Sequence, residues 1–149
     1  MIKYFAYGSN MDEKQIIKRG VIFTARQRAK LNGFKLVFNK VAQSNPEMGY
    51  ANIIDSPEDT VEGVLYEIDE SGIARLDRYE GAPDHYRRAL ALVTTVDGQI
   101  VTAIVYIAQP DKISDSVKPS RKYLEKLFSA REFLSDGYYL QLVATETID

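Results

Sequence analysis

Two short segments carry the residue types from which a chemical site could be built. The first is Tyr7-Gly8-Ser9-Asn10-Met11, in which the glycine allows a tight turn and the following N–H groups stand at the expected start of a helix. Such N–H groups attract anions, so the turn could hold a carboxylate or a developing oxyanion, with Asn10 adding an amide hydrogen bond. The simpler interpretation is a strand-to-helix turn in which Ser9 and Asn10 only cap the helix.

The second segment places one carboxylate among aromatic residues. It is Leu76-Asp77-Arg78-Tyr79-Glu80-Gly81, followed by Tyr86-Arg87-Arg88. If Tyr79 and Tyr86 exclude water, the pKa of Glu80 rises from about 4.3 toward neutrality, where the group can both accept and return a proton. The alternative is an exposed glutamate before a helix-ending glycine. The two arginines point to opposite faces of a strand, so one of them could meet an acidic substrate or Glu80. Exposure to solvent is the favoured interpretation, since long charged side chains are mostly exposed.

Other chemistries are less favoured. Ser9 has no histidine nearby in the sequence, and a Ser–His–Asp triad would need the distant His85. The chain has no cysteine and a single histidine, which excludes thiolate chemistry and a zinc site built from cysteine and histidine. Neither a GxGxxG fingerprint nor a P-loop is present, so no cofactor is expected.

Composition and charge narrow the class of partner. The 149 residues are 45% hydrophobic and 27% charged, which predicts one globular domain over residues 1–149. A formal net charge of −2 without a charge block predicts a small-molecule partner, and neither nucleic acid nor a membrane surface. The first residues are too short an apolar run for a signal peptide, and the absence of cysteine fits a reducing compartment, so a cytoplasmic location is expected.

The remaining sequence predicts the elements that must position these segments. Strands are expected over residues 2–7, 51–54, 61–68, 86–96 and 100–108, and over a hairpin at 21–39 that turns at Asn32-Gly33. Asp97-Gly98 is the strongest short hairpin signal. Helices are expected from Asn10 or Asp12 to Arg19, from Asp69 to Gly81 and from Pro119 to Phe133, while residues 137–148 fit either a helix or a strand. These elements predict an α+β fold with about three helices and a mostly antiparallel sheet that could close.

The order and separation of the two segments resemble a known family. Tyr4 to Met11 is similar to the N-terminal signature of the gamma-glutamyl cyclotransferase-like proteins, and Leu76 to Gly81 with Tyr86-Arg87-Arg88 is similar to their second motif. The resemblance continues through residues 61–66 and, more loosely, into Pro119-Ser120 and Tyr123. It implies a small mixed β-barrel with flanking helices. After Ala130 the sequence departs from the family pattern.

The same resemblance implies a reaction and a set of site residues. In that family the alpha-amine of a gamma-glutamyl compound attacks its own gamma-carbonyl and releases 5-oxoproline with an amine or amino acid. By motif, the acid–base catalyst falls on Glu80, and the substrate-binding positions fall on Tyr7, Gly8, Ser9, Asn10, Met11, Tyr86 and Tyr123. Two alternatives stay open, namely gamma-glutamyl transfer or hydrolysis in the same pocket, and a non-catalytic module that binds a small molecule.

Overall fold

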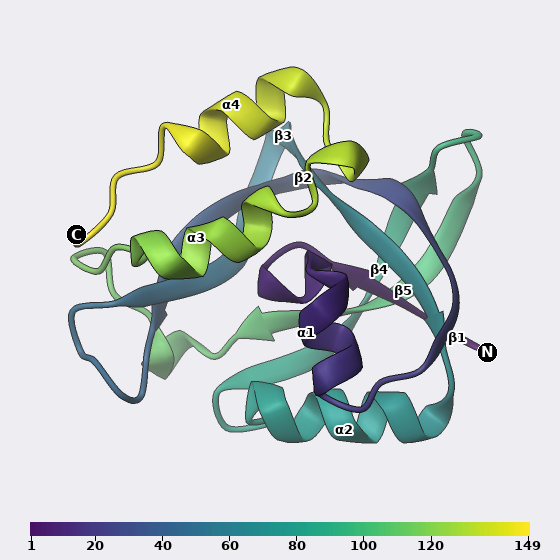
Figure 1. Cartoon of the computed structure of the whole chain (residues 1–149), viewed down its shortest axis with the longest axis horizontal. Coiled ribbons are helices and arrows are strands. Elements are labelled where there is room, and N and C mark those ends of the chain that lie inside the picture. Colours follow the sequence, from purple (N-terminus) through teal and green to yellow (C-terminus); the bar gives the residue numbers. More distant parts are fainter.

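The computed structural model describes all residues, 1–149, and its centre is a closed barrel of five strands (Figure 1). The strands are β1 (Ile2–Ala6), β2 (Phe23–Val41), β3 (Gly49–Ile68), β4 (Tyr86–Thr95) and β5 (Ile100–Ala108), in the order β1-β3-β2-β4-β5. Each neighbouring pair is antiparallel except β1 and β5, whose parallel contact closes the barrel. The predicted α+β, mixed and mostly antiparallel barrel is confirmed.

Four α-helices flank the barrel. They are α1 (Glu13–Lys18), α2 (Glu70–Glu80), α3 (Arg121–Phe128) and α4 (Asp136–Val143). In Figure 1, α4 lies at the top of the view with α3 below it, and α2 lies along the bottom. Residues 137–148, which the sequence left open, are largely helical in α4. The helix predicted through Phe133 ends at Phe128, because the chain turns through a short 3₁₀ segment and buries Leu134 in the core. None of these helices has the length and apolar character that crossing a membrane would need.

The prediction for residues 21–68 was wrong in its strand pairing. Residues 23–41 form one long strand that pairs with β3, rather than a hairpin turning at Asn32-Gly33. Gly33 lies instead at a register shift, with φ of 84°, and the turn formers at 56–59 bulge out of β3 at the same level. Two local breaks opposite one another leave the ladder intact on both sides, since a bulge bends a strand without ending it.

Alternating side chains of β1 connect the two hydrophobic clusters of the protein. Phe5 and Tyr7 belong to a cluster inside the barrel, while Tyr4 and Ala6 belong to a second cluster beneath the helices. Successive side chains of a strand point to opposite faces, so a strand covered on both sides must be apolar throughout. The strand therefore delivers the turn at Gly8 from the interior of the molecule.

Candidate functional site

A cavity of about 410 Å³ opens where the turn after β1 meets the C-terminal end of α2. Its volume is within the usual range of small-molecule sites. Glu80 is the only acidic side chain in its lining, against four basic ones: Arg19, Lys40, Arg78 and Lys126. Seven of the ten tyrosines also line it: Tyr4, Tyr7, Tyr50, Tyr79, Tyr86, Tyr106 and Tyr123. The cavity is thus rich in aromatic side chains and carries an excess of positive charge.

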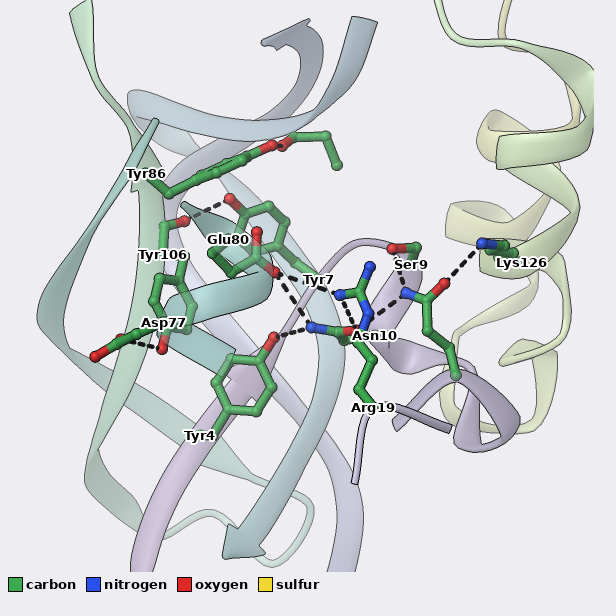
Figure 2. A network of polar contacts seen from close by, with 12 residues as sticks. Tyr4, Tyr7, Ser9, Asn10, Arg19, Asp77, Glu80, Tyr86, Tyr106 and Lys126 are labelled. Atoms are coloured by element: carbon green, nitrogen blue, oxygen red, sulfur yellow. Dashed lines mark hydrogen bonds and ion pairs between the residues drawn. The ribbon is translucent and has the colours of Figure 1, made fainter. Parts of the chain in front are cut away.

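Helix capping fixes the position of Glu80. The side chain of Asp69 accepts a hydrogen bond from Gly72 N–H at the start of α2, and Gly81 ends the helix in the left-handed conformation with φ of 63°. A side chain at position 81 would be strained there, and its Cβ would also lie 3.0 Å from the His85 ring. Glu80 is therefore the last helical residue, with its carboxyl group directed into the cavity (Figure 2).

The environment of Glu80 favours its protonated form. Its side chain is 19% exposed, and burial raises its pKa from 4.5 to about 7, although Arg19 and Lys40 act in the opposite direction. Asn10 Nδ2 donates to Glu80 Oε1 at 3.2 Å, and Arg19 Nη1 lies 3.9 Å from the same oxygen. A carboxyl group with this pKa can take up and give back a proton near pH 7.

Asn10 is the centre of the polar network around Glu80 (Figure 2). Its amide oxygen accepts hydrogen bonds from Gln15 Nε2 at 3.0 Å and from Arg19 Nη1 at 2.9 Å. These two donors define which end of the amide is the oxygen, so its nitrogen faces the Tyr4 hydroxyl at 3.0 Å as well as Glu80. Asn10 is 3% exposed, which leaves it little freedom to rotate.

Further contacts hold this network to α3. Gln15 Nε2 also donates to Ser9 Oγ at 2.6 Å, and Lys126 Nζ of α3 donates to Gln15 Oε1 at 2.7 Å. We call Ser9, Asn10, Gln15, Arg19 and Lys126 the turn side of the cavity. Every one of its members is hydrogen-bonded to another member.

Buried tyrosines complete the lining of the cavity. Tyr86 OH donates to Ala51 O at 2.7 Å, and Ala51 N–H donates in turn to Tyr123 OH at 3.1 Å. Tyr7 OH donates to Tyr106 O at 2.5 Å. Burial raises the pKa of the Tyr7, Tyr86 and Tyr123 hydroxyls, so all three remain protonated donors at neutral pH.

A second basic group lies away from the turn side. Lys40 Nζ, at the end of β2, donates to Val41 O at 2.9 Å and contacts His85 Nδ1 at 3.0 Å, while the other ring nitrogen of His85 contacts Gln43. Lys40 Nζ also lies 5.7 Å from the centre of the Tyr86 ring. We call Lys40, Gln43, His85 and Tyr86 the Lys40 side of the cavity.

Most of the site residues predicted from the sequence come together. The cavity lining includes Tyr7, Gly8, Ser9, Asn10, Glu80, Tyr86 and Tyr123. Met11 does not line it: its side chain is 1% exposed within the cluster beneath the helices. Gly8 lies so close to β3 and α3 that a Cβ there would be 3.0 Å from Ala51 Cβ of β3 and 3.3 Å from Tyr123 OH of α3.

Arg87 and Arg88 are both exposed, as the favoured interpretation expected, and neither reaches Glu80. Arg88 forms an ion pair with Asp77 at 2.6 Å, and Arg87 is exposed. The cations near Glu80 are Arg19 and Lys40. The sequence placed Arg19 at the end of a helix and gave Lys40, just after the hairpin predicted at 21–39, no role in the site. The tyrosines that flank Glu80 in the sequence and the high number of tyrosines both fit an aromatic cavity, but they equally fit core packing.

Known proteins resemble this chain in sequence and in fold. Residues 4–125 match the family model described as "Gamma-glutamyl cyclotransferase, AIG2-like". Gamma-glutamylcyclotransferase from Bos taurus is 33% identical over 124 residues, which cover 80% of this chain, and the chain spans only 64% of the length of that relative. A solved structure called gamma-glutamyl cyclotransferase superposes with a TM-score of 0.87 at 30% identity, over 99% of this chain and 89% of that one. YkqA from Bacillus subtilis superposes with a TM-score of 0.84 at 28% identity, over 96% of this chain and 53% of that one.

Proposed function

The chain belongs to the gamma-glutamyl cyclotransferase, AIG2-like family, and on this premise we propose that it converts a gamma-glutamyl compound into 5-oxoproline and a free amine or amino acid, with Glu80 as the acid–base catalyst. One observation carries the proposal. A single carboxyl group, with a pKa of about 7, lies in an aromatic cavity and is hydrogen-bonded by Asn10 of the turn. Such a group suits a reaction that moves protons between two nitrogen atoms near neutral pH.

In this reaction the substrate supplies its own nucleophile. The alpha-amine forms a C–N bond to the gamma-carbonyl carbon, and the bond from that carbon to the leaving nitrogen breaks. Two protons leave the attacking nitrogen, because an ammonium group becomes a lactam N–H, and two protons arrive at the leaving nitrogen, which departs as an ammonium group. Glu80 carries these protons in turn, and it ends the cycle in its starting form.

The turn side would hold the glutamyl part of the substrate. Excess positive charge from Arg19 and Lys126 suits the alpha-carboxylate, and the N–H groups at Gly8 to Asn10 begin a 3₁₀ turn, whose first N–H groups have no partner within the turn. The same N–H groups can stabilise the oxyanion that forms on the gamma-carbonyl. Folding the chain of the substrate into a near-attack conformation is expected to contribute more than either group alone.

Replacement of Glu80 by glutamine tests the proposal. The amide keeps the shape of the side chain but cannot accept the proton, so we expect Glu80→Gln to lower 5-oxoproline release at pH 8 by at least about 100-fold, the lower end for general acid–base catalysis. Formation of 5-oxoproline from gamma-glutamyl amino acids, amines and glutathione can be followed by mass spectrometry, which also distinguishes transfer or hydrolysis by their products.

Glu70→Gln is the matched control. Glu70 is an exposed residue at the other end of the same helix and lies outside the cavity. The Glu70→Gln variant should therefore turn over substrate like the unmodified protein. Full turnover by Glu80→Gln would exclude Glu80 as the catalyst, and no 5-oxoproline from the unmodified protein with any gamma-glutamyl compound would favour a binding module.

A further inference from the structure

The ammonium group of Lys40 is buried without an acidic partner. The residue is 3% exposed, and none of the ion pairs of the protein includes it. Two of its three N–H donors are used, one by Val41 O and one by His85 Nδ1. The third donor has no protein acceptor, although the residue lines the cavity. A buried cation with a free donor is costly unless an anion completes it.

His85 and Gln43 fix the orientation of the Lys40 side chain. To accept from the ammonium group, His85 Nδ1 must carry a lone pair, so the ring is neutral and its proton is on Nε2. The other ring nitrogen of His85, Nε2, contacts the side-chain amide of Gln43. Burial, with Lys40 itself adding to the effect, lowers the pKa of His85 and so maintains the neutral ring.

Positive charge thus lies on two sides of Glu80, and it comes from unrelated parts of the chain. Arg19 belongs to the N-terminal segment, whereas Lys40 lies near the end of β2, and both act on the Glu80 carboxylate. A gamma-glutamyl amino acid has a matching pattern, with one carboxylate on the glutamyl part and one on the leaving amino acid, on opposite sides of the bond that breaks. A gamma-glutamyl amine has only the carboxylate on the glutamyl part.

We propose that Lys40, positioned by His85 and Gln43, binds the carboxylate of the leaving amino acid and so selects gamma-glutamyl amino acids or peptides over gamma-glutamyl amines. This inference rests on the proposed function and names its substrate class. The glutamyl carboxylate is assigned to the turn side, because it shares a carbon with the amine that Glu80 must deprotonate and because Arg19 lies beside Glu80 there. The leaving group then extends toward Lys40.

Two substrates that differ only in the relevant carboxylate provide the test: gamma-glutamylalanine and gamma-glutamylethylamide. We expect kcat/KM of the unmodified protein to be about tenfold to hundredfold higher for gamma-glutamylalanine, as is typical for a hydrogen bond to a charged group. Lys40→Met, which keeps the length of the side chain and removes the charge, should bring this ratio close to one. Lys35→Met is the control, since Lys35 is exposed on the same strand and lies outside the cavity.

The outcomes separate this inference from the proposed function. If the unmodified protein turns over both substrates equally, or if Lys40→Met lowers both to the same degree, the subsite is excluded while the cyclisation stands. If neither substrate reacts, the cyclisation fails, and the subsite is judged by binding of the two compounds to Glu80→Gln, measured by calorimetry. Tighter binding of gamma-glutamylalanine that is lost in the double variant Lys40→Met/Glu80→Gln supports the subsite, and equal binding overturns it.

Discussion

The two sides of the cavity differ in how firmly they are held. On the turn side, Asn10 and Gln15 are buried, and their side chains form a continuous chain of hydrogen bonds from Glu80 to Lys126 of α3. On the Lys40 side, Lys40 is buried, but Gln43 is exposed on a loop and His85 is half-buried. A rigid side suits the part that every substrate shares, and a less constrained side suits the part that varies. Three further experiments would break or sharpen this comparison.

The largest effect is expected from Asn10→Ala. Loss of the Asn10 side-chain amide leaves the Tyr4 hydroxyl, Gln15 and Arg19 without their shared partner. It also frees Glu80 to move. We expect kcat/KM for 5-oxoproline formation to fall at least about 100-fold, and the free energy of unfolding in urea to fall by about 1–3 kcal/mol, as for a buried group left unsatisfied. Asn32→Ala, at an exposed position, is the control. Near-normal activity in Asn10→Ala would show that the turn side is less rigid than its contacts indicate.

The next effect is on stability as a function of pH. The pKa of Glu80 is about 7 in the folded protein and 4.5 as an unperturbed group, so between these values the folded state binds more protons than the unfolded state. Its stability therefore falls as the pH rises from 4.5 to 7 and changes no further through this group above 7. Glutamine does not ionise, so it does not lose stability as the pH rises. We expect the free energy of unfolding of Glu80→Gln to rise by up to about 3 kcal/mol relative to that of the unmodified protein over this pH window.

Urea unfolding of both proteins at several pH values from 4.5 to 8 measures this gain. The comparison is a difference between two curves, so other titrating groups contribute equally to both. A constant difference across the window would mean that the Glu80 carboxylate is solvated in the folded state.

The smallest effect compares the two cations directly. Arg19 and Lys40 both favour the charged form of Glu80, and Arg19 has the larger influence. Removing either cation should raise the pKa of Glu80, so the rise of kcat/KM with pH should move to higher pH, further for Arg19→Met than for Lys40→Met. Profiles with gamma-glutamylethylamide avoid the proposed carboxylate subsite. A larger displacement for Lys40→Met would place the stronger electrostatic control on the Lys40 side.

The sequence predicted best where local signals agreed with one another. The apolar run of β1 before Gly8, the helix α2 between Asp69 and Gly81 and the Asp97-Gly98 hairpin all formed as expected. The prediction failed at Asn32-Gly33, where another turn signal lies within a continuous strand. A turn dipeptide permits a change of direction, but the partner strand decides whether the chain bends back or only bulges.

The site shows the same division. The sequence by itself determined the two segments, the helix end that presents Glu80 and the glycine turn beside it, because these depend on φ/ψ preferences and capping within a few residues. Only the tertiary structure decided that Arg19 and Lys40, rather than Arg87 or Arg88, face Glu80, and that Met11 is in the core. Which charged groups meet depends on closing the barrel over tens of residues, and that closure, through burial, also sets the pKa of Glu80.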